Sequence, residues 1–329
     1  MSIKTYVWSL LIPQIVLLLF SPLLRNKPIF RWYYTRVFHP VFVDVNTFRW
    51  KFRTIPIFYL SVYIYCTALY FRDVEGLVRP RLYVLERWVI IPTIIAAPIC
   101  AGFLTLTKRP TTSRNWHSSE PYDNLIFHAG MSCRTCKLPK YARSKHCAIC
   151  NQCTQLSDHH CIWANNCIGL GNYQFFYGFL VSNVFLTTYG FLRLLTLRGL
   201  NRHRSLLVLS ILLGCFAVIL MVFTYFQLVL VRDGMTTSEE SKWLVVHDML
   251  SQGRLVIDQT GRYFYRIEDE TQMGHSAGVK NYAFYSTNPY DDKLYRVPFY
   301  EVVRGVNEIT NIYDKGTFWL NLRSRIHSE

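Results

Sequence analysis

Residues 133–167 read CRTCKLPKYARSKHCAICNQCTQLSDHHCIWANNC. Seven of the ten cysteines in the chain fall in this stretch, together with three histidines, and long apolar segments lie on both sides of it. Cysteine pairs separated by two residues, with histidines nearby, are typical of structural zinc sites, which take four such ligands. A site rich in thiolates requires a reducing compartment such as the cytosol. The stretch therefore predicts a metal-stabilised domain and not a disulfide framework.

This cysteine region contains more ligand groups than two zinc sites can use. Seven cysteines and three histidines make ten groups, whereas two closed tetrahedral sites need eight. One cysteine and one histidine therefore remain, and the count alone does not say which. Asp158 directly precedes His159, His160 and Cys161, which indicates that the remaining cysteine and histidine are among these neighbours. A cysteine beside a histidine and an aspartate provides a nucleophile, a base and a group that orients the base.

The composition of the chain predicts a membrane protein. Of its 329 residues, 51% are hydrophobic and 16% aromatic, whereas only 17% are charged, and the apolar residues are clustered. A formal charge of +15 could suggest nucleic acid. However, the basic residues flank apolar segments and alternate with aromatic ones, as on a surface that faces anionic lipid. The partner predicted from this pattern is the lipid bilayer, and no nucleic-acid partner is expected.

Five apolar segments are candidates for membrane-spanning helices. They cover residues 6–24, 55–71, 88–107, 175–197 and 206–231. We interpret the first as an uncleaved anchor and not a signal peptide, because no small-residue cleavage site follows it. If it were cleaved or lay flat, four spans would remain. An aromatic stretch at residues 30–42 is either an interfacial element on the membrane or a loop packed on the spans.

The distribution of charge predicts which side of the membrane each part faces. Residues 25–54 contain seven basic residues and one acid, Asp44, and the positive-inside rule places this loop in the cytosol. Counting spans then places the cysteine region and the C-terminal tail in the cytosol as well. A smaller basic group, Arg198, Arg202 and Arg204, opposes this assignment locally. The expected domains are residues 1–107 with the first three spans, the cysteine-rich domain 108–174, the last two spans 175–231, and the tail 232–329.

The cysteine region, with Asn172 and Phe176 beyond it, resembles the DHHC protein acyltransferases, also called palmitoyltransferases. The resemblance implies an all-α multi-pass membrane protein with four or five transmembrane helices and a small zinc-stabilised cytosolic domain of short β-hairpins. It also implies two structural Zn²⁺ ions with interleaved ligands. The first ion would bind Cys133, Cys136, His146 and Cys153, and the second Cys147, Cys150, His160 and Cys167.

In this family the remaining residues carry out a two-step transfer. The Cys161 thiolate would attack the thioester of palmitoyl-CoA and hold the acyl chain, while His159 moves the proton and Asp158 orients His159. A cysteine of a membrane protein would then take the chain. Burying its carbons at roughly 0.8 kcal/mol per methylene favours an apolar cavity between the spans. The candidates for its mouth, which could equally be interfacial anchors, are Phe175, Phe176 and Tyr177.

Two further motifs are similar to motifs of the family. Thr236, Thr237 and Glu239 resemble its TTxE motif, which would place Thr237 near the active site, although alone they predict only a helix-capping box. A C-terminal motif, which would tie the tail to the membrane domain or form a turn and a short helix, is matched by Asn311, Gly316 and Asn321. The usual Asp-Pro-Gly after an early span is absent.

The layout of the spans and the C-terminal ending look most similar to the fungal endoplasmic-reticulum branch of the family, which acts on SNARE proteins. This similarity implies an endoplasmic-reticulum membrane location and substrates with cysteines near their membrane spans. The alternative is a non-catalytic zinc-stabilised membrane adaptor or RING-like scaffold. A scaffold has no use for Asp158 beside a spare His159 and Cys161, so the sequence favours the enzyme. A zinc-finger nucleic-acid binder is disfavoured by the spans and by the absence of a basic recognition helix.

Overall fold

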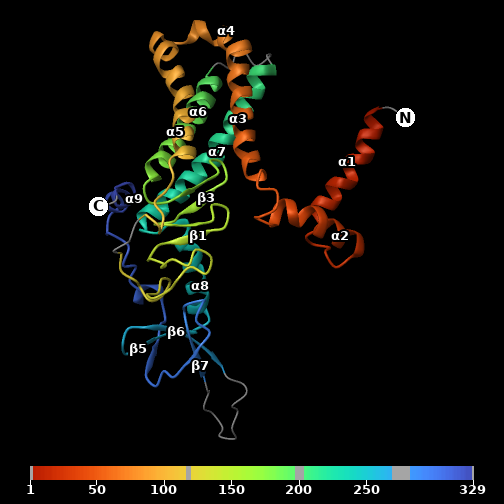
Figure 1. The fold of residues 1–329 in the computed structure, drawn as a ribbon. Helices are drawn as coiled ribbons and strands as arrows, with labels where there is room; N and C mark the ends of the chain where they lie inside the picture. Colours follow the sequence, from red (N-terminus) through yellow and green to blue (C-terminus); the bar gives the residue numbers. More distant parts are fainter. Residues whose placement is uncertain (1–2, 116–119, 197–203, 269–281, 328–329) are drawn as a thin grey trace. The chain divides into compact units, whose positions relative to one another are not determined.

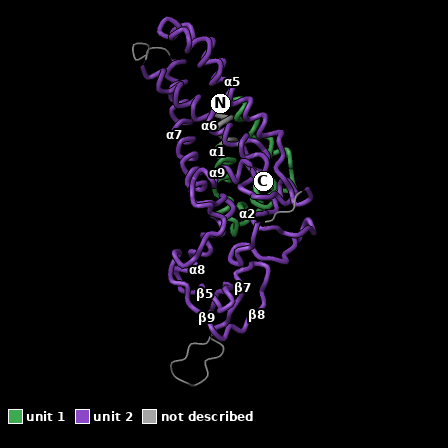
Figure 2. Tube along the Cα trace, turned by 90° about the vertical axis from the view of Figure 1, so that its left-hand side faces the viewer, with its two compact units in different colours: residues 1–61 green, residues 62–329 purple. Residues whose placement is uncertain are grey.

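The computed structural model describes residues 3–115, 120–196, 204–268 and 282–327, with side chains from residue 12 onward. The chain forms two compact units, Met1–Ser61 and Val62–Glu329, which are coloured separately in Figure 2.

The first unit is helical. It contains α1 (Ile3–Phe20), α2 (Pro28–Tyr33), the π-helical segment η1 (Tyr34–Val43), which continues α2, and the beginning of α3 (Lys51–Leu69). Three aromatic rings spaced four residues apart contact each other along the helix formed by α2 and η1. The ring centroids of Tyr34 and Phe38 are 5.6 Å apart, and those of Phe38 and Phe42 are 5.1 Å apart. The aromatic stretch at residues 30–42 is therefore a helix.

Within the described residues, four helices are long and apolar enough to cross a membrane. They are Lys51–Arg81, Glu86–Thr107, Tyr173–Leu195 and Arg204–Arg232. They coincide with four of the five predicted spans, and the predicted class of a helical multi-pass protein is confirmed. The first of them runs from α3 through η2 (Tyr70–Val74), α4 (Glu75–Val78) and η3 (Arg79–Arg81), and the second joins η4 (Glu86–Ile90) to α5 (Ile91–Thr107).

Helix α6 (Tyr173–Leu195) packs against both α5 and α7 (Arg204–Arg232), as Figure 1 shows. Small residues permit the close approach. A Cβ atom added at Gly102 of α5 would lie 3.0 Å from the ring of Phe179, and one at Gly214 of α7 would lie 2.8 Å from the ring of Phe191. Aromatic rings of α6 thus fill the space above glycines of both neighbours, a form of packing common between membrane helices.

A buried carboxylate joins η4, the segment that precedes α5, to α6. The Glu86 carboxylate lies 2.8 Å from Nε of Arg193 and accepts a 2.5 Å hydrogen bond from the hydroxyl of Tyr189. A charged residue in an otherwise apolar helix is costly in a membrane unless it is paired. This pairing explains how α6 accommodates Arg193.

Two antiparallel hairpins form the cysteine-rich region, as expected. They pair β1 (Lys145–Cys147) with β2 (Gln152–Thr154), and β3 (His159–Cys161) with β4 (Asn166–Ile168). Asn166 fastens the second hairpin to the membrane helices, because its amide donates 2.8 Å hydrogen bonds to the carbonyls of Thr105 and Lys108 at the end of α5. The hairpin therefore lies against the end of the helix bundle (Figure 1).

The tail folds into α8 (Thr237–Ser251), a five-stranded sheet, the short 3-10 helix η7 (Val306–Glu308) and α9 (Phe318–Ile326). The sheet was not anticipated from the sequence. Its strand order is β8-β7-β6-β5-β9, and the strands are β5 (Leu255–Asp258), β6 (Tyr263–Glu268), β7 (Tyr282–Ser286), β8 (Leu294–Tyr295) and β9 (Tyr300–Val302).

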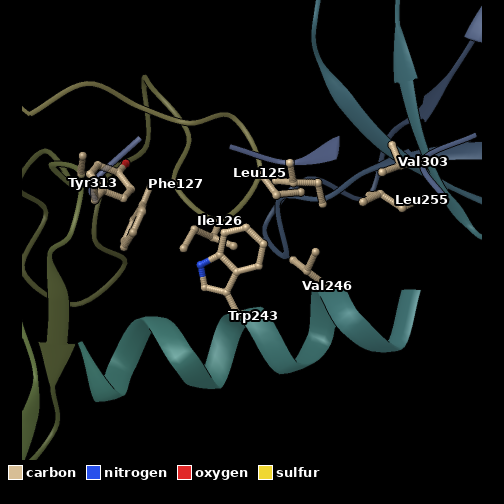
Figure 3. Packing of buried hydrophobic residues seen from close by; sticks show 10 residues of the cluster. Leu125, Ile126, Phe127, Trp243, Val246, Leu255, Val303 and Tyr313 are labelled. Carbon is tan, nitrogen blue, oxygen red and sulfur yellow. The ribbon is translucent and has the colours of Figure 1, made fainter. Parts of the chain in front are cut away.

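One apolar core joins the tail to the cysteine-rich region. Figure 3 shows Trp243 and Val246 of α8 packed with residues 125–127, which precede the first cysteines, and with Leu255 of the sheet. The next residue, Val256, belongs to a second cluster, because successive side chains of a strand point to opposite faces. The tail is consequently part of the same folded body as the cysteine region.

Candidate active site and metal clusters

Two groups of side chains have the composition and spacing of zinc sites. In each, three thiols and one imidazole place their ligand atoms within 4.8 Å of one another. The groups are Cys133, Cys136, His146 and Cys153, and Cys147, Cys150, His160 and Cys167. These are the eight ligands that the resemblance implied, and each group can hold a metal ion.

The separations within the groups agree with a tetrahedral zinc. In the second group, Nδ1 of His160 lies 3.4 Å from Sγ of Cys150 and 3.7 Å from Sγ of Cys167. A tetrahedral zinc ion with bonds of about 2.3 Å to sulfur and about 2.0 Å to nitrogen places a sulfur and a nitrogen ligand roughly 3.6 Å apart. Three thiolates and one imidazole are a common ligand set for structural zinc.

The hairpins bring the ligands together through their register. His146 lies opposite Cys153 in the first hairpin, and His160 lies opposite Cys167 in the second. Each cross-strand pair is completed by a Cys-x2-Cys pair that precedes its hairpin. Because the pair Cys147–Cys150 spans the turn of the first hairpin, the second group uses residues from both hairpins.

The two adjacent histidines of strand β3 face opposite sides of the strand and belong to different sites. Side chains alternate along a strand, so His159 and Cys161 share one face, whereas His160 points to the other. His160 joins the second metal group, and neither group contains His159 or Cys161. These are the two residues that remain when eight of the ten groups are assigned to metal.

Asp158, His159 and Cys161 lie in series and interact with one another. The Asp158 carboxylate lies 2.6 Å from Nδ1 of His159, and His159 and Cys161 are close enough for each to shift the pKa of the other. Asp158 is only 2% exposed. Its two oxygens accept hydrogen bonds of 3.0 Å from the backbone N–H of Thr237 and 2.9 Å from the Thr237 hydroxyl. The hydrogen bonds from Thr237 thus fix the orientation of the Asp158 carboxylate toward the imidazole of His159.

This arrangement shifts the pKa of each group in the series. Burial opposes ionisation of Asp158, but hydrogen bonds from His159 and Thr237 hold its pKa below the usual range. Burial also opposes the imidazolium, yet Asp158 and Cys161 raise the pKa of His159 to about 9. Burial raises the pKa of Cys161, and the hydrogen bond and charge of His159 more than offset it, so its pKa is lowered. The site favours a thiolate beside a charged imidazole.

The TTxE residues begin α8 and hold it against the site. Thr236 and Glu239 form a capping box, in which the side chain of each bonds the backbone N–H of the other. The Glu239 carboxylate also forms a buried ion pair with Arg143 of the cysteine region, at 2.6 Å. Arg143 in turn donates a 2.9 Å hydrogen bond to the carbonyl of Gly234. The helix that orients Asp158 is therefore itself anchored to the cysteine region.

The C-terminal motif fastens the tail to the end of α7. The Asn311 amide donates a 2.9 Å hydrogen bond to the carbonyl of Asp233, and the Asn321 amide donates a 3.1 Å bond to the carbonyl of Arg232. Gly316 has a φ of +84°, which glycine adopts without strain. The hydrogen bonds of Asn311 and Asn321 go to the end of α7 and not to Cys161, so the motif holds the tail in place.

The aromatic residues at the start of α6 have different surroundings. Phe176 is buried and makes an edge contact with the His159 ring, with centroids 5.3 Å apart. The Tyr177 hydroxyl accepts a 3.0 Å hydrogen bond from Arg325 of α9. Phe175 is half-buried. Of the three, Phe176 is the residue in contact with the catalytic candidates.

Sequence reasoning missed several residues of this network. Arg143 and Arg325 are both buried, and neither lies in a recognisable spacing pattern. Gln227 of α7 is also buried and donates a hydrogen bond to Thr237. A single amide in an apolar span was a signal that could have identified Gln227.

Comparison with known proteins agrees with this geometry. The family model described as DHHC palmitoyltransferase matches residues 126–244. The palmitoyltransferase SWF1 of Candida glabrata is 45% identical over 334 residues, which cover 97% of this chain and 98% of the relative. The palmitoyltransferase SWF1 of Saccharomyces cerevisiae is 42% identical over 328 residues, covering 96% and 98% of the two chains.

The similarity extends over nearly the whole chain, and the family match includes both metal groups and the TTxE residues. The resemblance found in the sequence is thereby confirmed. The chain belongs to the DHHC palmitoyltransferase family, the protein S-palmitoyltransferases.

Proposed function

We propose that the enzyme transfers palmitate from palmitoyl-CoA to protein cysteines by a ping-pong reaction in which Cys161 carries the acyl group. The observation that supports this most is the series Asp158–His159–Cys161, in which Asp158 hydrogen-bonds His159 and His159 interacts with Cys161, beside two metal groups that use none of the three. A purely structural zinc domain would have no use for such a series.

The metal groups would each hold one Zn²⁺ with a structural role. Closed sites of four protein ligands leave no position for substrate, and such sites stabilise folds too small to form a core of their own. The zinc ions would fix the hairpins, and hence the position of β3 relative to the end of the membrane helices. The donor sets and separations described above suit this assignment.

In the first step, the Cys161 thiolate would attack the carbonyl carbon of the palmitoyl-CoA thioester. The new bond forms from sulfur to carbon, and the bond to the CoA sulfur breaks. The imidazolium of His159 would give its Nε2 proton to the departing CoA thiolate, because Nδ1 is engaged by Asp158. CoA leaves as the thiol, and palmitoyl-Cys161 remains with a neutral His159.

In the second step, a cysteine thiol of the protein substrate would lose its proton to Nε2 of His159. Its sulfur attacks the carbonyl of palmitoyl-Cys161 and displaces the Cys161 thiolate. The imidazolium and thiolate are restored, so the site is ready for another cycle. The same histidine therefore acts as acid and then as base, and Asp158 stabilises its charged form in both steps.

The substrates would be membrane proteins with cysteines close to their spans, and the similarity to the fungal branch favours SNARE-type proteins. We place the enzyme in the endoplasmic-reticulum membrane, with the cysteine-rich domain and tail in the cytosol. The basic loop 25–54 and the reducing environment that thiolates require support this orientation. Two of the proposed domains, 1–107 and 175–231, would then hold the membrane spans. The other two, 108–174 and 232–329, would lie in the cytosol.

Incubation of the purified protein with labelled palmitoyl-CoA tests the proposal. Label that hydroxylamine removes should appear on the wild type and be absent from Cys161→Ser, with the zinc content of the two proteins equal. As a matched control, Cys100→Ser changes a cysteine that lies outside both metal groups and should leave the label in place. A zinc-loaded wild type without label would contradict the proposal.

A further inference from the structure

Gln227 is a polar residue at an unusual position. It lies in the membrane-spanning helix α7, five residues before the end of a helix that is otherwise almost entirely apolar, and it is only 3% exposed. Its amide nitrogen Nε2 lies 3.3 Å from Oγ1 of Thr237. Its carbonyl oxygen Oε1 is buried and has no hydrogen-bond partner among the described residues.

The hydrogen-bond directions in this region are fixed by chemistry. An ionised carboxylate only accepts, so the hydroxyl proton of Thr237 is committed to Asp158, over 2.9 Å. The Thr237 oxygen then has only lone pairs to offer its remaining neighbour. Gln227 must accordingly present its N–H group, and not its carbonyl, toward Thr237. The donor series runs from Gln227 through Thr237 to Asp158, which also accepts from Nδ1 of His159.

The orphaned carbonyl argues against a purely structural reason for Gln227. Burying an amide carbonyl without a partner costs stability, whereas an apolar side chain of the same length would pack in a membrane helix without that cost. A residue that is unfavourable for stability and that donates toward a catalytic candidate is better explained by the reaction.

We infer that Gln227 is a positioning residue for the acyl-transfer site: it fixes the rotation of the Thr237 hydroxyl and thereby the orientation of the Asp158 carboxylate. This inference rests on the proposed roles of Asp158 and Cys161. Gln227 itself does not touch substrate, and its effect reaches His159 only through Thr237.

A double-mutant cycle on the full-length protein tests the inference. Acylation of Cys161 by palmitoyl-CoA is measured for the wild type, Gln227→Met, Thr237→Val and the double variant. Gln227→Met should slow acylation about three- to tenfold without raising KM for palmitoyl-CoA, the size expected for one lost hydrogen bond. In the Thr237→Val background the same change should have less than about a twofold effect, because the link is already broken.

Thermal unfolding separates positioning from packing. Since Gln227→Met removes an unpaired buried carbonyl, its melting temperature should equal or exceed that of the wild type. Phe226→Met, at a neighbouring position of α7 that is 59% exposed, should leave acylation unchanged.

Equal effects of Gln227→Met in both backgrounds would overturn the inference, as would a loss of rate that parallels a loss of melting temperature. If the wild type forms palmitoyl-Cys161 and Gln227→Met forms it at the same rate, the positioning role of Gln227 is contradicted and the proposed function is not. A wild type that forms no palmitoyl-Cys161 would contradict the proposed function and, with it, this inference.

Discussion

At the scale of single residues, two adjacent histidines have opposite surroundings. His159 contacts Asp158 and lies on the face of β3 that carries Cys161, whereas His160 belongs to a metal group with Cys167 opposite it. The alternation of a strand is sufficient to produce this division. A shift of register by one residue would exchange the two roles, so the hairpin pairing is essential to the site.

This division predicts different consequences for two alanine substitutions. His159→Ala should keep both zinc ions and slow acylation of Cys161 by about a hundredfold or more, because the proton can no longer be transferred at the site. His160→Ala should instead lose one zinc ion per chain and the fold of the second hairpin. Metal analysis and single-turnover acylation of both variants check this, and loss of zinc from His159→Ala would contradict the assignment.

The sequence identified the metal and catalytic candidates because their chemistry is encoded in local spacing. Cys-x2-Cys pairs and the tetrad ending at Cys161 are recognisable without a fold. Arg143, by contrast, pairs with Glu239 from 96 residues away, and Gln227 reaches Thr237 only because α7 ends and α8 turns back. Such contacts depend on how elements pack, which spacing in the chain does not specify.

At the scale of elements, helix α8 is the link between the active site and the tail. Its first turn holds Asp158 through Thr237, and its third residue, Glu239, pairs with Arg143, both side chains being almost fully buried. Removing one partner of a buried ion pair leaves an uncompensated charge. The start of α8 is therefore expected to be sensitive to small changes.

Glu239→Gln should destabilise the protein by about 3 kcal/mol, since it leaves Arg143 buried without its counter-charge. Glutamine preserves the size of the side chain and can still serve at this position of a capping box, so the effect isolates the charge. The matched control is Glu240→Gln, an exposed neighbour, which should change stability by less than about 0.5 kcal/mol. Equal thermal stability of the two variants would disprove the expectation.

The turn between α7 and α8 requires a glycine at position 234. Its φ is +63°, and an added Cβ would lie 2.6 Å from the Cα atom of Asp314. Gly253 has a similar φ of +61° but open space around it. Gly253→Ala should thus cost about 1–2 kcal/mol for the left-handed backbone alone, and Gly234→Ala clearly more, with faster hydrogen exchange in residues 311–325. A smaller effect at Gly234 than at Gly253 would contradict this account.

The helices were predictable because a span of the membrane demands a long apolar run, which a sequence displays directly. The tail sheet was not. Its strands have two to six residues, and β9 pairs with β5 although β6, β7 and β8 lie between them in the chain. Short strands with mixed composition carry little periodic signal, and pairing between distant segments is decided by the shared core around Trp243.

At the scale of the whole molecule, metal binding and the membrane helices together position β3, the strand that carries His159 and Cys161. Strands of three residues do not persist alone in water, so the hairpins depend on their metal and on hydrogen bonds such as those from Asn166 to the end of α5. The tail core then packs against the same region.

Removal of the metal should accordingly disorder the cysteine-rich region while sparing the spans. Treatment with a strong chelator is expected to abolish hydrogen-exchange protection in residues 133–172 and acylation of Cys161, and to leave the protection of α6 and α7 intact. Added zinc should restore both properties. Protected hairpins in the metal-free protein would show that the metal is not needed for this fold.

Eight of the ten cysteine and histidine groups hold two zinc ions in this account, and the remaining two, His159 and Cys161, perform the transfer. Native mass spectrometry of the full-length chain after brief exposure to palmitoyl-CoA tests it most directly, with fragmentation to locate the acyl group. We predict two zinc ions per chain and one palmitoyl group, on Cys161. Retention of fewer than two zinc ions, or a palmitoyl group on a cysteine of either metal group, would contradict the account.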